Sequence, residues 1–162
     1  MAKKPLSALT KDLRKFVTDA RTEAGPVIVR SLQIEGPWWT GDFGEHWKIS
    51  RSPVMPTEKP ESLTRAWAPG PEARNYPAVG KLRVALEKAM YIGNSVSYAG
   101  FAVNRSGATV TRPDGRQITY AEHAKERRIT PPSKNPRWYD IYTQNGGLLD
   151  DLTKAFRAAG AQ

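Results

Sequence analysis

The chain has 162 residues, of which 39% are hydrophobic, and carries a formal net charge of +9. A chain of this length forms one domain of ordinary size and buries roughly 68–70% of the surface that its unfolded form exposes. It contains no cysteine, which excludes disulfides, thiolate catalysis and zinc sites built on cysteine. The positive charge makes nucleic acid or another acidic surface a reasonable neighbour, but it does not indicate a mechanism.

The sequence also argues against a membrane protein. No stretch approaches the ~20 consecutive apolar residues that a membrane helix needs. Residues 1–5 contain two lysines but are not followed by the apolar run of a secretory signal. We therefore expect a soluble protein that is intracellular when it is made.

Residues 6–34 show the periodicity of an amphipathic helix. Apolar residues recur at steps of three and four, beginning with Leu6, Leu9, Leu13 and Phe16, and charged residues lie between them. Pro26 interrupts the pattern because proline lacks the backbone N–H and its ring contacts the preceding turn. The sequence predicts a long kinked helix that ends before Gly36.

The next region combines a turn, a strand and a long loop. After a turn at Thr40 and Gly41, alternation around Phe43, Glu45, Trp47 and Ile49 predicts a half-buried strand. Residues 53–77 then carry six prolines, too many for the interior of any helix or strand. A loop of this length usually contacts a partner or stays disordered.

Further strands are expected in the second half. Periodicity does not decide between helix and strand for residues 79–90, and we favour a strand. Residues 90–103, rich in β-branched and aromatic side chains, predict a strand followed by a short apolar segment. Segments 109–111 and 117–120 flank the turn residues Pro113, Asp114 and Gly115, which predicts a hairpin at the edge of the sheet.

Residues 138–159 predict a C-terminal helix. Asp150 and Asp151 lie early in it, whereas Lys154 and Arg157 lie late, the order of charge that a helix dipole favours. Gly146 and Gly147 weaken its first half, since each glycine costs about 1 kcal/mol inside a helix. The predicted fold class is therefore α+β: one domain over residues 1–162, with a long kinked N-terminal helix and a C-terminal helix packed on a small antiparallel sheet.

No residue pattern indicates catalysis, a metal or a cofactor. His46 and His123 each follow a glutamate, but no third ligand has motif spacing. Neither a nucleophile elbow nor a glycine-rich phosphate loop is present. Asp150 and Asp151 could act as an acid–base pair, although stabilising the helix dipole is the commoner role of such residues. We expect a protein that is not an enzyme.

Two other groups of residues have open interpretations. Trp38, Trp39 and Trp47 lie near one turn and form either part of the core or anchors of a subunit interface. The basic residues of the second group lie close to Trp138 and Tyr139 and either hold phosphates, with bases stacked on the rings, or form a solvated loop. These residues are Arg127, Arg128, Lys134 and Arg137.

Two segments resemble a known family. Residues 36–50, with the sequence GPWWTGDFGEHWKIS, resemble the proline–x–x–Thr–Gly turn and Trp-containing strand of tailed-bacteriophage neck and tail-completion proteins, which include minor tail protein Z-like proteins. Residues 90–101, with the sequence MYIGNSVSYAGF, resemble that family's strand ending in Asn and the Tyr–Ala pair that opens a short helix. Asp42 replaces the family's usual basic residue, and Val103 and Asn104 replace an acidic residue and a glycine.

The resemblance implies a structural protein of the virion with no catalytic residues and no cofactor. Such subunits form a homo-oligomeric ring, of six or twelve copies, at the head-to-tail joint, where they act in neck, tail completion or tail termination. The expected partners are other neck, connector and tail proteins, with non-specific contact to genomic DNA in the lumen and assembly in the host cytoplasm. The residues expected at subunit contacts are Trp38, Trp39, Thr40, Gly41, Trp47, Pro56, Pro60, Trp67 and Tyr98.

The alternative function is that of a small basic nucleic-acid-binding protein. It is supported by the net charge of +9 and by Arg127, Arg128, Lys134 and Arg137. Salt distinguishes the two, because phosphate-driven binding weakens steeply with ionic strength, whereas a ring built on apolar contacts survives it.

Overall fold

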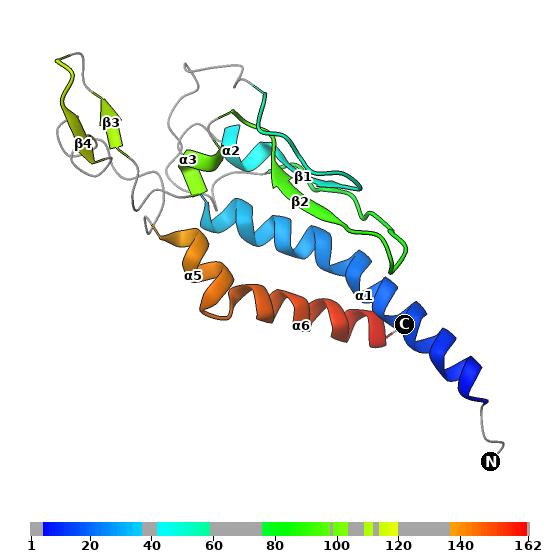
Figure 1. The fold of residues 1–162 in the computed structure, drawn as a ribbon. Coiled ribbons are helices and arrows are strands. Elements are labelled where there is room, and N and C mark those ends of the chain that lie inside the picture. Colours follow the sequence, from blue (N-terminus) through cyan, green and yellow to red (C-terminus); the bar gives the residue numbers. More distant parts are fainter. Residues whose placement is uncertain are drawn as a thin grey trace.

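A computed structural model describes residues 5–36, 42–58, 76–97, 99–103, 109–111, 114–119 and 137–161. The predicted α+β class is confirmed. A long N-terminal helix, a C-terminal helical region and a two-stranded antiparallel sheet pack together, with the sheet on one side of the long helix and the C-terminal helices on another (Figure 1).

The N-terminal helix α1 spans Leu6–Glu35, one residue beyond the predicted range. The helix continues through Pro26, because the residues just before the proline are packed into the protein and hold the backbone in place. Ala24 is 2% exposed, and Gly25 lies against Ile49 of the sheet. The helix ends at Gly36, whose backbone N–H donates to the carbonyl of Leu32 at 3.1 Å.

The predicted C-terminal helix over residues 138–159 is two helices, so this prediction was wrong in its continuity. Helix α5 spans Trp138–Gln144 and helix α6 spans Gly147–Gly160. Gly146 separates them with φ at +100°, in the left-handed region that glycine adopts without steric cost. The chain turns at this point, and α6 runs along α1 (Figure 1).

The sheet pairs the two segments on which the family resemblance rests. Strand β1, Trp47–Ser50, is antiparallel to β2, Tyr91–Asn94, with Trp47 opposite Asn94. The strand predicted around Phe43 begins later, because Asp42–Glu45 form a helical turn, α2. Phe43 and Trp47 are four residues apart, and both side chains are buried with their rings edge-to-face at 5.5 Å.

The predicted hairpin is present but does not extend the first sheet. Strand β3, Thr109–Thr111, pairs antiparallel with β4, Gln117–Thr119, through a turn in which Gly115 has φ at +81°. Among the described strands, β1–β2 and β3–β4 form two separate ladders. The expectation of an edge excursion of one sheet was therefore wrong.

Residues 79–90 do not form the strand that we favoured. The Arg21 guanidinium donates to the carbonyls of Ala85 at 3.4 Å, Leu86 at 3.3 Å and Lys88 at 2.6 Å. These carbonyls are thus satisfied by a side chain of α1 instead of a neighbouring strand. The segment lies along α1 in an irregular conformation with a turn at residues 86–88.

The core lies where α1, the sheet, the short helix α3 (Ala99–Val103) and α5 meet. Trp138 is 3% exposed and donates from its indole nitrogen to the carbonyl of Ala102 at 3.1 Å. Its ring is edge-to-face with Phe43 at 5.9 Å. The buried residues of this core are Val29, Leu32, Phe43, Trp47, Val96, Ala99, Ala102, Trp138 and Tyr142.

Candidate subunit-contact surfaces

The two segments that resemble the phage family are tied together by Asn94. Its side-chain nitrogen donates to the carbonyl of Phe43 at 2.6 Å, and its side-chain oxygen accepts from the backbone N–H of Val96 at 3.1 Å. Asn94 is 6% exposed. The resemblance placed an Asn at the end of this strand, but its bond to the α2 turn was not predicted, because only the tertiary structure brings Phe43 within reach.

Trp47 belongs to the core. It is 5% exposed in the single chain, and it packs on Phe43 and on the apolar cluster around Val96. Trp47 was expected either in the core or as an anchor of a subunit interface. The structure places it in the core, where its ring is not exposed. Trp38, Trp39, Thr40 and Gly41 lie outside the described residues.

The beginning of the proline-rich loop is anchored beside the sheet. Glu58 donates from its backbone N–H to the carbonyl of Ser95, and the N–H of Ser97 donates to the carbonyl of Glu58, both at 2.8 Å. The Lys48 ammonium pairs with the Glu58 carboxylate, and this contact holds the pKa of Glu58 below its usual value. Pro56 is exposed and remains a candidate contact, whereas Pro60, Trp67 and Tyr98 lie outside the described residues.

The candidate nucleic-acid-facing residues are described only at Arg137. Its side chain is exposed, and its Nε atom lies 3.7 Å from a carboxylate oxygen of Asp140. Arg127, Arg128 and Lys134 lie outside the described residues.

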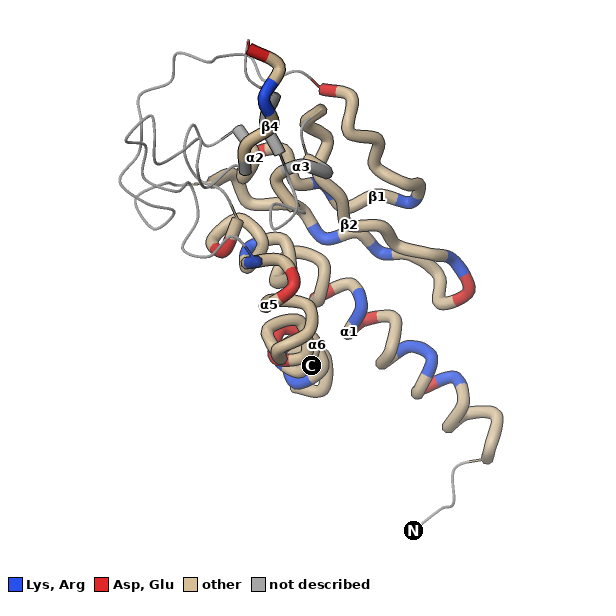
Figure 2. The backbone as a smooth tube through the Cα atoms, turned by 60° about the vertical axis from the view of Figure 1, so that its left-hand side comes forward, with Lys and Arg blue, Asp and Glu red and all other residues tan. Residues whose placement is uncertain are grey.

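Other basic side chains pair with carboxylates within the fold. Lys15 and Arg83 both bond to Asp19, at 2.9 and 2.5 Å, and these bonds lower the pKa of its carboxyl. Lys81 bonds to Glu23 at 2.7 Å. Figure 2 shows basic and acidic residues alternating along α1, in keeping with this pairing. Part of the positive charge is thus balanced locally.

The described residues include no cluster of three or more His, Cys, Asp or Glu side chains that could hold a metal ion. His46 lies 3.6 Å from the Glu58 carboxylate, and His123 lies outside the described residues. Within the same ranges, no helix has the length and apolar character needed to cross a membrane.

A buried polar network that sequence reasoning missed joins α5 to α6. The Tyr142 hydroxyl donates to the Asp151 carboxylate at 2.8 Å, and Lys154 bonds to the other carboxylate oxygen at 3.1 Å. Burial, followed by the bond to Asp151, raises the pKa of Tyr142. Asp151 is 2% exposed, and its two carboxylate oxygens are bonded to Tyr142 and Lys154. Asp150 does lie in the first turn.

The sequence feature that points to this network is the helical spacing of residues around Asp151. Asp151 falls on the same face of α6 as Leu148 and Ala155, which are three residues before it and four after it. This face packs toward α1, and a carboxylate there requires a buried partner. The sequence pattern therefore indicates a satisfied buried acid, but it does not indicate that Tyr142 is the donor.

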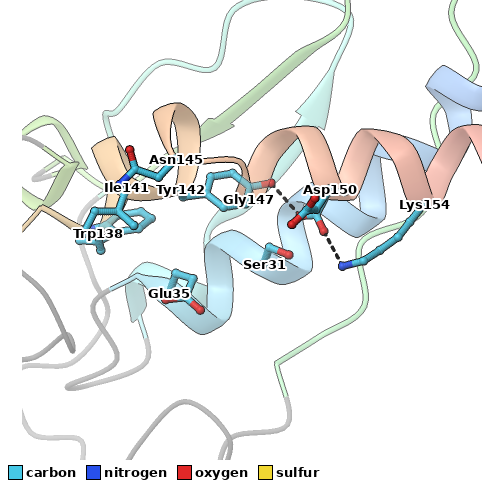
Figure 3. A pocket seen from close by; sticks show the side chains of 10 residues that line it. Ser31, Glu35, Trp138, Ile141, Tyr142, Asn145, Gly147, Asp150 and Lys154 are labelled. Carbon is cyan, nitrogen blue, oxygen red and sulfur yellow. Dashed lines mark hydrogen bonds and ion pairs between the residues drawn. The ribbon is translucent and has the colours of Figure 1, made fainter.

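An acidic hollow lies between the end of α1 and the α5–α6 elbow. It has a volume of about 430 Å³, and Figure 3 shows Ser31 and Glu35 of α1 facing side chains of α5 and α6. Ile141 at its rim is 39% exposed. The charged residues that line it are Glu35, Asp150, Asp151 and Lys154. Glu35 and Asp150 are exposed, whereas Asp151 is buried and bonded to Tyr142 and Lys154.

The N-terminal part of α1 carries an uncovered apolar stripe. Leu6 is 80% exposed, Leu9 is 51% exposed and Leu13 is 62% exposed. Helix α6 ends at Gly160, close to Phe16, and the Phe16 and Phe156 rings meet edge-to-face at 5.7 Å. Beyond this contact, α1 projects past the end of α6 (Figure 1).

No family model, no curated protein and no solved structure matches this chain in the comparisons with known proteins.

Proposed function

We propose that this chain is a structural subunit of a tailed-phage virion that forms a ring at the head-to-tail joint, as a neck, tail-completion or tail-terminator protein. The observation that carries the proposal is the pairing of the two family-like segments. Strand β1 follows the Thr–Gly segment, strand β2 ends at the expected Asn94, and the two strands are neighbours joined through Phe43.

The arrangement around this pair also supports the proposal. A long helix precedes the Thr–Gly segment, and a short helix begins at Ala99, the second residue of the Tyr–Ala pair. The short helix is the one that the resemblance implies after the strand that ends in Asn, and the long helix is the one that the apolar periodicity predicts. The uncovered leucines of α1 add a surface typical of a protein that works in an assembly.

Mass spectrometry and immunogold labelling of purified particles from the source test this function directly. The chain is expected as a stoichiometric component at the head-to-tail joint, in about six or twelve copies, as closed-ring symmetry suggests. A frameshift in its gene should leave filled heads and tails that do not join or tails of irregular length, and the wild-type chain supplied in trans should restore infectious particles. Purified particles without the chain would overturn the proposal.

A small basic nucleic-acid-binding protein remains the second candidate, supported by the net charge of +9. We rank it lower because Lys15, Arg83 and Lys81 are engaged with carboxylates. It requires duplex DNA binding that weakens steeply as salt rises and that is lost when Arg127, Arg128 and Arg137 are neutralised together. Particles that lack the chain, combined with such binding, would make this the better assignment.

A further inference from the structure

The segment that leads into β2 is fastened to α1 by charged side chains. We call residues 81–88 the strap; the segment lies beside α1 and turns back toward the sheet (Figure 1). The ion pairs that join the strap to α1 are Lys81–Glu23 at 2.7 Å, Arg83–Asp19 at 2.5 Å, and Glu87–Arg14. The basic side chain of each pair is more than half exposed. The pairing runs antiparallel, since later strap residues meet earlier residues of the helix.

Arg21 provides a fourth attachment. Its guanidinium donates to the carbonyls of Ala85, Leu86 and Lys88. The strap has one backbone hydrogen bond of its own, from the N–H of Lys88 to the carbonyl of Ala85 at 2.9 Å. Within the described ranges it belongs to neither strand ladder. Side chains, and not a main-chain ladder, therefore hold the strap in place.

The strap buries little apolar surface. Val84 is 7% exposed and is its one buried residue, whereas Leu82 and Leu86 are partly buried and the other strap residues are exposed. Val84 also lies outside the main core cluster. Ion pairs at exposed positions contribute little individually and are screened by salt, whereas apolar burial is not. The attachment of the strap should therefore respond to ionic strength more strongly than the core does.

Both ends of the strap are anchored independently of it. Before the strap, Tyr76 is 5% exposed and Val79 packs against the core. After the strap, Tyr91 begins β2 and pairs with Ser50 of β1. Gly80 lies between the first anchor and the strap, and a Cβ at this position would meet open space. The strap can therefore move away from α1 while both anchors stay in place.

We propose that the strap is a salt-sensitive cover, which opens from α1 as one unit while the α1–α6 core and the β1–β2 sheet stay folded. In the closed state it covers one side of α1 between Arg14 and Glu23, and Leu6 and Leu9 beyond it are exposed. Opening makes this side of the helix accessible up to Glu23. Ionic strength thus sets how much of α1 a partner can reach, whichever of the two candidate functions the protein performs.

Thiol labelling of the full-length chain measures the opening, because the sequence contains no cysteine. Val84→Cys places a single thiol beneath the closed strap. Ala155→Cys places one on the buried face of α6, where Ala155 is 1% exposed, and Ala85→Cys places one on the exposed side of the strap. N-ethylmaleimide is uncharged and reacts only with an accessible thiol. Its rate at a buried position therefore reports how often that position opens.

Local opening predicts a definite order of rates. Val84→Cys should react more slowly than Ala85→Cys but at least about a hundredfold faster than Ala155→Cys, which needs the core to open. Raising NaCl from about 0.05 M to about 0.5 M should accelerate Val84→Cys about tenfold, because three surface pairs each lose about a factor of two. The rates of Ala85→Cys and Ala155→Cys should stay within about twofold over the same range.

Substitutions on α1 test the individual attachments in the Val84→Cys background. Arg21→Gln removes the donor to three carbonyls and should accelerate labelling at least about tenfold. Arg30→Gln is the matched control, because Arg30 is exposed on the same helix beyond the last strap contact and loses the same charge; it should label at the parent rate. Arg14→Glu should also accelerate labelling, and adding Glu87→Arg, which restores an opposite-charge pair, should slow it again.

Two results would overturn the proposal. In the first, Val84→Cys reacts as slowly as Ala155→Cys, so the strap opens only when the whole protein unfolds. In the second, salt leaves the Val84→Cys rate unchanged or accelerates both variants by the same factor.

Trypsin cleavage of the wild-type chain after Arg83 gives the same answer if Val84→Cys lowers the melting temperature. Cleavage at a site that must open first follows the population of the open state. Its rate, measured relative to that of a free peptide of the strap sequence, should rise with salt. A ratio that does not change with salt would contradict the proposed opening.

Discussion

Replacing Asn94 with alanine should destabilise the protein strongly, because it breaks both hydrogen bonds that this side chain makes. The carbonyl of Phe43 and the N–H of Val96 would each lose a partner, and Val96 is 0% exposed. A buried polar group left unsatisfied costs about 1–3 kcal/mol. We therefore expect a loss of about 2–4 kcal/mol in the free energy of unfolding, out of roughly 5–15 kcal/mol for a typical domain.

Urea unfolding followed by tryptophan fluorescence and circular dichroism measures this loss. Ser97→Ala is the matched control, because it removes a polar side chain from an exposed position three residues later. The two variants should differ in unfolding midpoint and have equal slopes. If Asn94→Ala lies within about 0.5 kcal/mol of Ser97→Ala, the usual range for neutral surface changes, the role assigned to Asn94 is incorrect.

A second substitution at the same position adds a pH test. In Asn94→Asp, the carboxylate still accepts from Val96 but cannot donate to the carbonyl of Phe43. Burial disfavours the charged form, so the folded pKa of the new carboxyl lies above its unfolded value. The destabilisation should therefore be largest at neutral pH and shrink as pH falls through the folded pKa toward the unfolded one. A loss that is constant over this range would contradict the reasoning.

Two further predictions concern stability. Burial raises the pKa of Tyr142 above its ordinary value of 10.0. The contribution of Tyr142 to stability is therefore complete below pH 10 and declines as pH rises toward the folded pKa. Absorbance at 295 nm should show that wild type retains one more protonated tyrosine than Tyr142→Phe until the protein unfolds. Gly44→Ala would place a Cβ on the Tyr76 ring, whereas a Cβ at Gly80 meets open space. Gly44→Ala should lower the free energy of unfolding by about 1–3 kcal/mol, and Gly80→Ala should be nearly neutral. Equal melting temperatures for the two variants would show that the Tyr76 ring moves freely.

Sequence periodicity predicted the elements whose pattern is long and has one solution. The stripe that begins at Leu6 repeats over some eight turns, so α1 was predicted to within one residue at its C-terminal end. The hairpin around Asp114 and Gly115 was likewise predicted, since its turn chemistry is local. The sequence placed Leu6, Leu9 and Leu13 on one face of this helix, but it did not indicate that these leucines are uncovered.

Short patterns were ambiguous, and tertiary contacts decided them. Phe43 and Trp47 satisfy both a two-residue alternation and a four-residue helical step, and packing together with the bond from Asn94 selects the helical turn of α2. Residues 79–90 have a pattern compatible with a strand, but the Arg21 guanidinium takes three of their carbonyls.

The sequence by itself determined the α+β class, the long helix with one apolar face, and the presence of strands near Trp47 and within residues 90–103, but not that these strands pair. Local spacing suffices for these features, because it sets which side chains share a face. Only the tertiary structure decided where α6 stops along α1, that Trp47 is buried, and that Asp151 bonds to Tyr142. Each of these depends on groups distant in sequence or on the length of a neighbouring helix, and no local pattern carries that information.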